Sequence, residues 1–255
     1  MKIALLQLAP HGPIAAPPDM LRQRLRALAT AGVELAVLPE LLLPGYNQPQ
    51  AHATLRADAR DAIVALAQDA GLAIAFGWAE RVGNRVYNAA SLIDQSGRTL
   101  LHYRKLQLFG PMERTSFAPG TQTPGVGTLN GVRIGLLICY DIEFPEHARA
   151  IARQGCDLLL VPTANPAGFE HVQRLLVPAR AYENCVTVVY ANYAGADGDM
   201  TFGGGSVIAG PDGGVLATAG PGPATLIVDL PVADAYDPNL LSTQLADLNL
   251  PRTDI

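Results

Sequence analysis

The sequence has few cysteines, few charges and no long apolar run. Of 255 residues only 3 are cysteines and 16% are charged, and the net charge is -5. Three widely spaced cysteines form no disulfide framework and match no zinc-binding spacing. A nucleic-acid partner requires a basic face, and a membrane span requires roughly 20 apolar residues in a row; the sequence offers neither. We therefore expect no nucleic-acid partner and no membrane contact, and a reducing, cytoplasmic setting with usable free thiols.

Apolar residues are abundant, and they follow the periods of alternating strands and helices. Hydrophobic residues make up 49% of the chain, which is typical of a globular domain with a large core. Alternation and β-branched runs predict strands over 3–8, 34–40, 72–80, 86–94, 98–105, 129–140, 157–165 and 185–193, with hairpin strands between 202 and 230. Helical spacing predicts helices over 18–31, 55–70, 145–154 and 171–184, and a loop over 106–128.

These elements predict one α/β domain over residues 1–255. Several strands are apolar on both faces, so we expect a further layer on each side of the sheet system. The last 25 residues, 231–255, mix polar and apolar residues without a clear period. We interpret them as a C-terminal arm.

A reactive residue follows directly after three of the predicted strands. These residues are Glu40, Lys105 and Cys139. In layered α/β folds ligands gather beyond the carboxyl ends of strands, so the three side chains could meet. A glutamate could take the proton of the thiol, and a lysine could stabilise the oxyanion of an attacked carbonyl. The plainer alternatives also stand: a buried cysteine usually acts as a small hydrophobe, and a glutamate or lysine at a strand end is usually solvated.

The thiol of Cys139 has acidic neighbours in the sequence. Asp141, Glu143 and Glu146 follow it within seven residues. Nearby carboxylates raise the pKa of a thiol and make it a weaker nucleophile at neutral pH. We expect Lys105 to offset these charges.

Four motifs in order resemble the nitrilase, or carbon–nitrogen hydrolase, superfamily. They are PELLLPGY (39–46), YRKLQLF (103–109), ERTSFAPG (113–120) and LLICYDIEFPE (136–146), and VPTAN (161–165) and GSVIAGPDG (205–213) are also similar. The resemblance covers roughly residues 2–230 and implies a four-layer α-β-β-α sandwich that forms a homodimer or a higher homo-oligomer. It implies a catalytic Glu40–Lys105–Cys139 triad and a second catalytic glutamate, Glu113. It also implies an oxyanion site formed by Lys105 and the backbone N–H of Tyr140.

Within the superfamily the chain is most similar to amidases that act on small aliphatic amides. We expect hydrolysis of a carboxamide to a carboxylic acid and ammonia through a cysteine thioester, with no metal and no organic cofactor. Glu143 stands where relatives that process carboxylate-bearing acyl groups often carry arginine, so an amino-bearing or neutral substrate is expected. An equally open alternative is that Glu143 only forms a salt bridge within the fold. Motif position makes Tyr46 and Asn165 further substrate-binding residues.

Three other functions remain open at this stage. A nitrilase would use the same triad. An N-carbamoyl amino acid amidohydrolase would also use it, but it needs basic residues for the substrate carboxylate, and only acids and His147 lie near Cys139 in the sequence. A non-catalytic binding member of the fold would be expected to lack a triad residue, and this chain lacks none.

Overall fold

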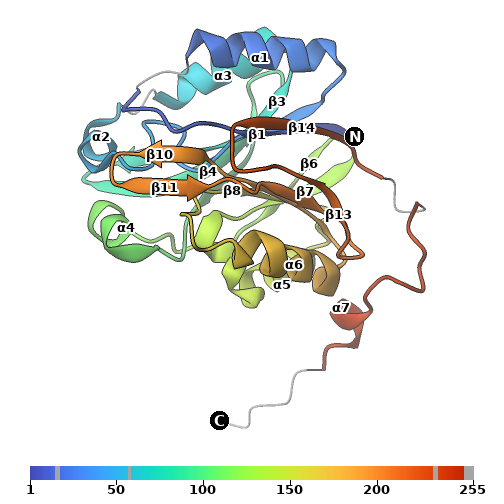
Figure 1. Ribbon diagram of the computed structural model, residues 1–255. Coiled ribbons are helices and arrows are strands. Elements are labelled where there is room, and N and C mark those ends of the chain that lie inside the picture. The colour runs from blue at the N-terminus through green and yellow to red at the C-terminus, as the bar shows by residue number, and fades with distance from the viewer. Residues whose placement is uncertain (15–17, 57–58, 232–234, 250–255) are drawn as a thin grey trace, which may run out of the picture.

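Two six-stranded sheets lie face to face and form the centre of the molecule (Figure 1). The computed structural model describes residues 1–14, 18–56, 59–231 and 235–249. The first sheet has the order β14-β1-β2-β3-β4-β5 and the second has the order β13-β12-β9-β8-β7-β6. In the first sheet the strands are β1 (Lys2–Gln7), β2 (Leu35–Val37), β3 (Ala73–Val82), β4 (Arg85–Ile93), β5 (Thr99–Arg104) and β14 (Ala224–Asp229). In the second they are β6 (Val126–Leu129), β7 (Val132–Leu136), β8 (Leu158–Pro162), β9 (Thr187–Ala191), β12 (Val207–Ala209) and β13 (Val215–Thr218).

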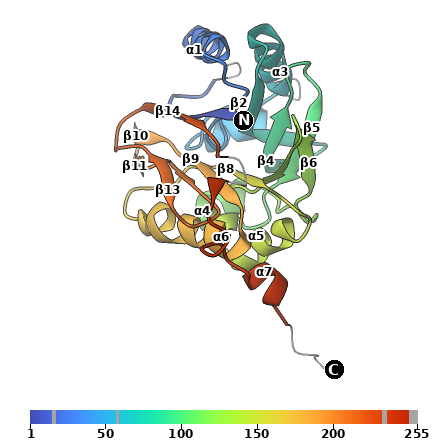
Figure 2. The ribbon, with the colours of Figure 1, turned by 90° about the vertical axis from the view of Figure 1, so that its right-hand side faces the viewer.

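Helices cover the outer face of each sheet (Figures 1 and 2). Helices α1 (Asp19–Thr30) and α3 (Ala59–Ala70) lie on the first sheet, and α5 (Pro145–Ala152) and α6 (Val177–Asn184) lie on the second. This arrangement is the predicted four-layer α-β-β-α sandwich. The remaining elements are the helices α2 (Pro49–Thr54), α4 (Gly110–Ser116) and α7 (Gln244–Asp247) and the hairpin β10 (Ala194–Asp197)–β11 (Met200–Gly203).

Strand β1 shows why both faces of these strands are apolar. Ile3 and Leu5 belong to the core between the two sheets, whereas Ala4 and Leu6 pack in the core beneath α1 and α3. Because successive side chains of a strand point to opposite faces, a strand buried on both sides must be apolar throughout. The expectation of a covering layer on each side is confirmed.

The predicted loop over 106–128 and the single predicted strand over 129–140 are wrong. The first contains α4 and most of β6, and the second is divided by a turn at Asn130 and Gly131. Both turn residues have positive φ, 48° and 82°, as in the two-residue hairpin turns that Asn-Gly favours. Strand β7 then ends at Leu136, three residues before Cys139.

Other boundaries also differ from the prediction. The predicted helix 55–70 begins at Ala59, and Leu55 lies just after α2, which the sequence did not indicate. The predicted helix 171–184 consists of a π-helical turn, η2 (Val172–Leu176), followed by α6. Pro178 at the start of α6 has no N–H to donate, and such a residue is tolerated in a first helical turn.

The C-terminal residues that the structure describes, 235–249, are mostly exposed, and α7 lies beyond α5 and α6 (Figure 2). Residues 232–234 and 250–255, which the predicted arm includes, lie outside the described residues. None of the described helices is both long enough and apolar enough to span a bilayer.

Candidate active site

Glu40 lies in a tight turn after β2, pressed against β3. Its backbone N–H donates to the carbonyl of Thr163, just after β8 of the other sheet, at 3.3 Å. On the other side, the N–H of Gly77 donates to Pro39, and a Cβ on Gly77 would lie 2.6 Å from the Cα of Glu40. Only glycine permits this approach. The turn is therefore fixed from both sheets.

Lys105 follows β5 and forms the centre of a buried ion cluster. Its Nζ donates to Oε1 of Glu40 at 2.6 Å and to Oε1 of Glu113 at 2.7 Å. The side chains of all three residues have no exposed surface. The lysine therefore bridges the predicted triad glutamate and the predicted second glutamate.

Further hydrogen bonds orient both carboxylates. Asn88 donates to Oε1 of Glu40 at 2.7 Å, and the hydroxyl of Tyr46 donates to Oε1 of Glu113 at 2.8 Å. The backbone N–H of Phe109 donates to Oε2 of Glu113 at 2.9 Å. Tyr46, predicted as a pocket residue, thus contacts Glu113 directly. Because the side chains of Asn88 and Tyr46 are buried, they hold each carboxylate in one orientation.

Oε2 of Glu40 is different from the other three carboxylate oxygens of this cluster. It is buried and has no hydrogen-bond partner among the described residues. A buried carboxylate oxygen without a donor is costly, so such an atom is often part of a reaction. It can accept a proton without first breaking a hydrogen bond.

Cys139 begins a short 3-10 helix, η1 (Cys139–Glu143), which follows β7 of the second sheet after Leu137 and Ile138. Its φ is +46°, in the left-handed region that non-glycine residues rarely adopt. Cys139 is 7% exposed, whereas Lys105 is 1% and Glu40 is 0% exposed. Cys139 is therefore the most exposed of these three residues.

Burial raises the pKa of the Cys139 thiol well above its ordinary value, and the charges of Glu40 and Glu113 raise it further. Lys105 and a hydrogen bond from the backbone of Ala164 act in the opposite direction. The lysine thus offsets part of the acidic surroundings, as the sequence indicated. However, the effects that raise the pKa of the thiol come mainly from burial and from Glu40 and Glu113, and not from Asp141, Glu143 and Glu146. The resting residue is a thiol, and attack requires a base.

Burial also raises the pKa of Glu40 to about 7, with a further increase from Glu113 and an opposing effect of Lys105. The pKa of Lys105 lies well above its ordinary value because the attraction of Glu113 and Glu40 outweighs the effect of burial. A carboxylate with a pKa near neutrality can both accept and return a proton at pH 7. The permanently charged lysine can stabilise a negative oxygen.

The other predicted residues lie at or next to this cluster. Tyr140 is the second residue of η1, and the first N–H groups of a helix have no intrahelical acceptor. Asn165 donates both amide protons within the fold, to the carbonyl of Phe169 at 3.0 Å and to Gln173 at 2.8 Å. Its amide protons are therefore engaged in holding the segment after β8.

Glu143 ends η1 and is about half-buried, and burial raises the pKa of its carboxyl group. Its charge interacts with His171, Lys105 and Arg180. The guanidinium of Arg180 donates to the backbone carbonyls of Ile142 and Glu143, both at 3.0 Å, and not to the carboxylate. Among the described residues, the Glu143 carboxylate forms no hydrogen bond or ion pair.

The sequence reasoning did not identify Asn88 as part of the site. Asn88 and Ser91 are the polar residues in the buried part of β4, residues 88–93, and an amide in a mostly apolar strand is a signal that could have found Asn88. The structure also shows that Arg180 binds the end of the Cys139 turn.

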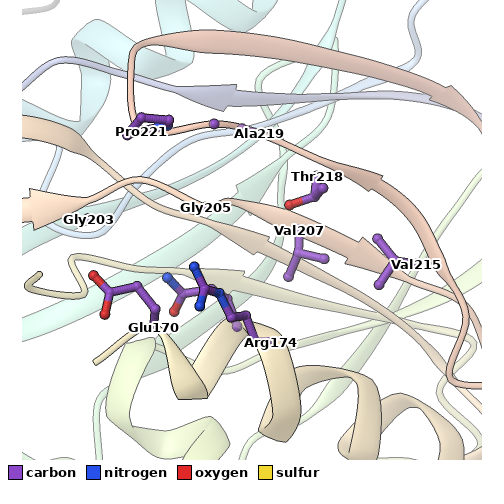
Figure 3. Close-up of a pocket in the computed structure, with 11 residues that line it drawn as sticks. Glu170, Arg174, Gly203, Gly205, Val207, Val215, Thr218, Ala219 and Pro221 are labelled. Carbon is purple, nitrogen blue, oxygen red and sulfur yellow. The ribbon is translucent and has the colours of Figure 1, made fainter. Parts of the chain in front are cut away.

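A surface cavity of about 620 Å³ lies between η2 and the strands β11 to β13 (Figure 3). Glu170 and Arg174 line one side and Gly203, Gly205 and Thr218 the other. None of Glu40, Lys105, Glu113 and Cys139 lines it. Gln173, which also lines it, accepts the hydrogen bond from Asn165 and connects its wall to the site. Within the described part of the chain, no three His, Cys, Asp or Glu side chains are grouped as metal ligands.

A cysteine held beside a buried glutamate–lysine pair, within an α-β-β-α sandwich, defines a class of hydrolases that attack carbon–nitrogen bonds. The chain belongs to the carbon–nitrogen hydrolase family, whose model matches residues 2–237. It is 36% identical to an (R)-stereoselective amidase from Pseudomonas sp. over 90% of this chain and 85% of that protein.

Solved structures of amidases are also similar to this chain over almost its whole length. The NitN amidase from Neterenkonia sp. AN1 superimposes with a TM-score of 0.88 at 38% identity, covering 97% of this chain and 96% of that one. A cysteine-to-alanine mutant of an amidase from Nesterenkonia sp. AN1, solved in complex with butyramide, has a TM-score of 0.88 at 37% identity and covers 97% of this chain and 94% of that chain.

Proposed function

We propose that this protein is an amidase that hydrolyses a small aliphatic carboxamide to a carboxylic acid and ammonia through a thioester on Cys139. The observation that carries this proposal is the buried cluster in which Lys105 bridges Glu40 and Glu113 beside the thiol. The butyramide bound to the Nesterenkonia amidase supports a short aliphatic acyl group. No metal or organic cofactor takes part in the proposed reaction.

In the first half-reaction, the sulfur of Cys139 attacks the amide carbon while Oε2 of Glu40 takes the thiol proton. Lys105 and the backbone N–H of Tyr140 donate to the resulting oxyanion. The tetrahedral intermediate collapses by breaking the C–N bond, and Glu40 gives its proton to the leaving nitrogen, which departs as ammonia. The acyl group remains on sulfur as a thioester.

In the second half-reaction, water attacks the thioester carbon and Glu40 takes a proton from that water. Lys105 and the Tyr140 N–H again hold the oxyanion. Breaking the C–S bond releases the carboxylic acid, and the proton on Glu40 returns to the sulfur of Cys139. Glu113, oriented by Tyr46, holds Lys105 and orients the substrate amide.

Glu143 is proposed to favour substrates that carry an amino group on the acyl chain. Its carboxylate is half-buried without an ion-pair partner among the described residues, so a cationic substrate would supply that partner. The rings of Phe109, Tyr140 and Phe169 pack edge-on at 5.2 and 5.7 Å, and aromatic faces can also attract an ammonium group. Asn165 is proposed to act by holding the backbone of Phe169.

The test of the activity is ammonia release from butyramide, butyronitrile and an N-carbamoyl amino acid, with Cys139→Ala as the control. We expect the amide to be the best substrate and the variant to be inactive. Preference for the nitrile or the carbamoyl compound would support one of the alternative hydrolases. Turnover that survives in Cys139→Ala would contradict the mechanism, and no turnover by the wild type would favour a non-catalytic binding member.

The test of Glu143 compares 4-aminobutyramide with butyramide. We expect Glu143→Gln to lower the kcat/KM for 4-aminobutyramide relative to that for butyramide about tenfold. The reason is that the variant loses one charge interaction with the amino group in a partly buried site. Glu146→Gln, at an exposed acid on α5, is the matched control and should leave the ratio unchanged. An unchanged ratio in Glu143→Gln would show that this residue only braces the turn.

We further propose that the chain forms a homodimer or a larger homo-oligomer in the cytoplasm. Leu175, Tyr182 and Val215 support assembly, since they expose 66%, 39% and 53% of their surface on η2, α6 and β13. Light scattering of the purified protein checks the mass. The cytoplasmic proposal rests on the free thiols and is tested by fractionating the source cells.

A further inference from the structure

Asp141 is a fully buried carboxylate that takes part in no step of the proposed reaction. It lies two residues after Cys139, and 0% of its surface is exposed. Three donors surround it: the Tyr103 hydroxyl at 2.9 Å, the Gln107 N–H at 2.9 Å and the Ile138 N–H at 3.2 Å. Burial raises the pKa of this carboxyl group, and Lys105 together with these three donors acts in the opposite direction.

Two of these donors come from the segment that carries Lys105. Tyr103 ends in a hydroxyl that also accepts the N–H of Leu106 at 3.2 Å, and Gln107 is two residues after the lysine. The backbone of Lys105 is itself fixed, because its N–H donates to Asn88 and its carbonyl accepts from Gly120, both at 2.8 Å. The Lys105 segment, which supplies two of the donors to Asp141, therefore has a fixed backbone and can serve as an anchor.

The cysteine side of the contact needs such an anchor. Cys139 has a φ of +46°, and a non-glycine residue keeps this sparsely populated conformation only when its surroundings enforce it. The Asp141 carboxylate accepts a hydrogen bond from the N–H of Ile138, just before Cys139, and another from the N–H of Gln107 in the Lys105 segment. It therefore ties the backbone on the N-terminal side of Cys139 to the Lys105 segment. An asparagine has one acceptor oxygen and would turn an N–H group toward these donors.

We propose that Asp141 is a positioning residue that sets the Cys139 turn of the second sheet at a fixed place relative to Lys105 of the first sheet. This proposal rests on the proposed amidase function for its kinetic readout. It requires that the reactivity of the Cys139 thiol, and not only the stability of the fold, depends on the Asp141 carboxylate.

The experiment compares wild type, Asp141→Asn and Tyr103→Phe, with Asp94→Asn as the matched control. Asp94 is also a well-buried aspartate, but it accepts from Ser96 and Arg98 in the turn after β4. We measure kcat and KM for butyramide, the thermal midpoint, and the rate at which iodoacetamide alkylates Cys139, followed by peptide mass spectrometry. Rates are normalised to the folded fraction.

We expect Asp141→Asn to lower kcat about 10²-fold with KM changed less than about threefold, as for a reacting group that is slightly displaced. Tyr103→Phe removes one donor and should lower kcat about tenfold. Alkylation of Cys139 should slow about tenfold in Asp141→Asn. Asp94→Asn should lower the thermal midpoint without changing kcat or the alkylation rate.

The proposal is overturned if folded Asp141→Asn keeps kcat and the alkylation rate within twofold of wild type, whatever its thermal midpoint. If Asp141→Asn does not fold, Tyr103→Phe decides by the same twofold criterion. A wild-type protein that releases no ammonia from any amide contradicts the proposed function instead. In that case the alkylation rates, which need no substrate, still test Asp141.

Discussion

Replacing Glu113 by glutamine should move the pH dependence of the reaction to lower pH. Glu40 must be ionised to take the thiol proton, so activity should rise with pH as Glu40 loses its proton, near pH 7 in the wild type. The negative charge of Glu113 is one of the causes that raise the pKa of Glu40. Without this charge, the Glu40 carboxylate forms at lower pH.

The size of the change follows from the geometry of the cluster. Both carboxylates contact the same Nζ of Lys105, at 2.6 and 2.7 Å. Two such oxygens are about 5 Å apart, where unit charges interact by about 3 kcal/mol at an effective dielectric constant of about 20. That energy corresponds to about two pH units, and relaxation around the glutamine reduces it. We expect the acid limb to move down by about one to two pH units.

The assay is kcat/KM for butyramide between pH 5 and 9, since this parameter reports groups of the free enzyme. If Glu113→Gln turns over too slowly, the alkylation rate of Cys139 over the same pH range replaces it. Tyr46→Phe is the control, because it removes a hydrogen bond to Glu113 but no charge. Its acid limb should stay within about 0.5 pH units of wild type. An acid limb of Glu113→Gln at or above the wild-type pH would refute this reasoning.

Three further predictions concern the residues around Glu40. Gly77→Ala should lower the free energy of unfolding by about 1–3 kcal/mol and kcat about 10²-fold, because the new methyl group displaces the Glu40 turn; denaturant unfolding and steady-state kinetics check this. Asn88→Leu should lower kcat more than tenfold with a small change in KM, through a misdirected Glu40, and an unchanged kcat would contradict it. The folded-state pKa of Glu40, about 7, lies above its unfolded value, so the folded protein binds more protons between these values and wild-type stability falls as pH rises from about 4.5 to 7. Urea unfolding of the wild type across this pH range should show the loss, about 3 kcal/mol, and urea unfolding of Glu40→Gln should not.

The fold could be predicted because its strands and helices have clear periods. The expected strands 3–8, 72–80, 86–94 and 98–105 correspond to β1, β3, β4 and β5, and the expected helices 18–31 and 145–154 to α1 and α5. Strands that are apolar on both faces indicated the covering layers. The positions of Glu40, Lys105 and Cys139 after strands indicated that they could meet, and in the structure Lys105 is hydrogen-bonded to Glu40 and both charges act on the thiol of Cys139.

What could not be predicted depends on contacts between distant segments. The Asn-Gly turn at 130–131 was a local signal that the reasoning overlooked. By contrast, no local pattern shows that Gly77 faces Glu40 or that Asp141 accepts from Gln107, because both contacts exist only after the elements pack. The net effect on the thiol also needed the structure. Sequence neighbours suggested that Asp141, Glu143 and Glu146 surround the thiol, whereas burial and the distant Glu40 contribute most.

The site is divided between the two halves of the chain. Glu40, Lys105 and Glu113 precede the exposed residues Thr121–Thr123, and Cys139 follows them. The second half also returns β14 to pair with β1 of the first sheet, from Lys2 to Gln7. A cut at 121–123 would therefore separate the base from the nucleophile while leaving each fragment a strand that the other needs. The two fragments of such a split enzyme would each release no ammonia when kept apart, and recovery of ammonia release would report that they have reassociated.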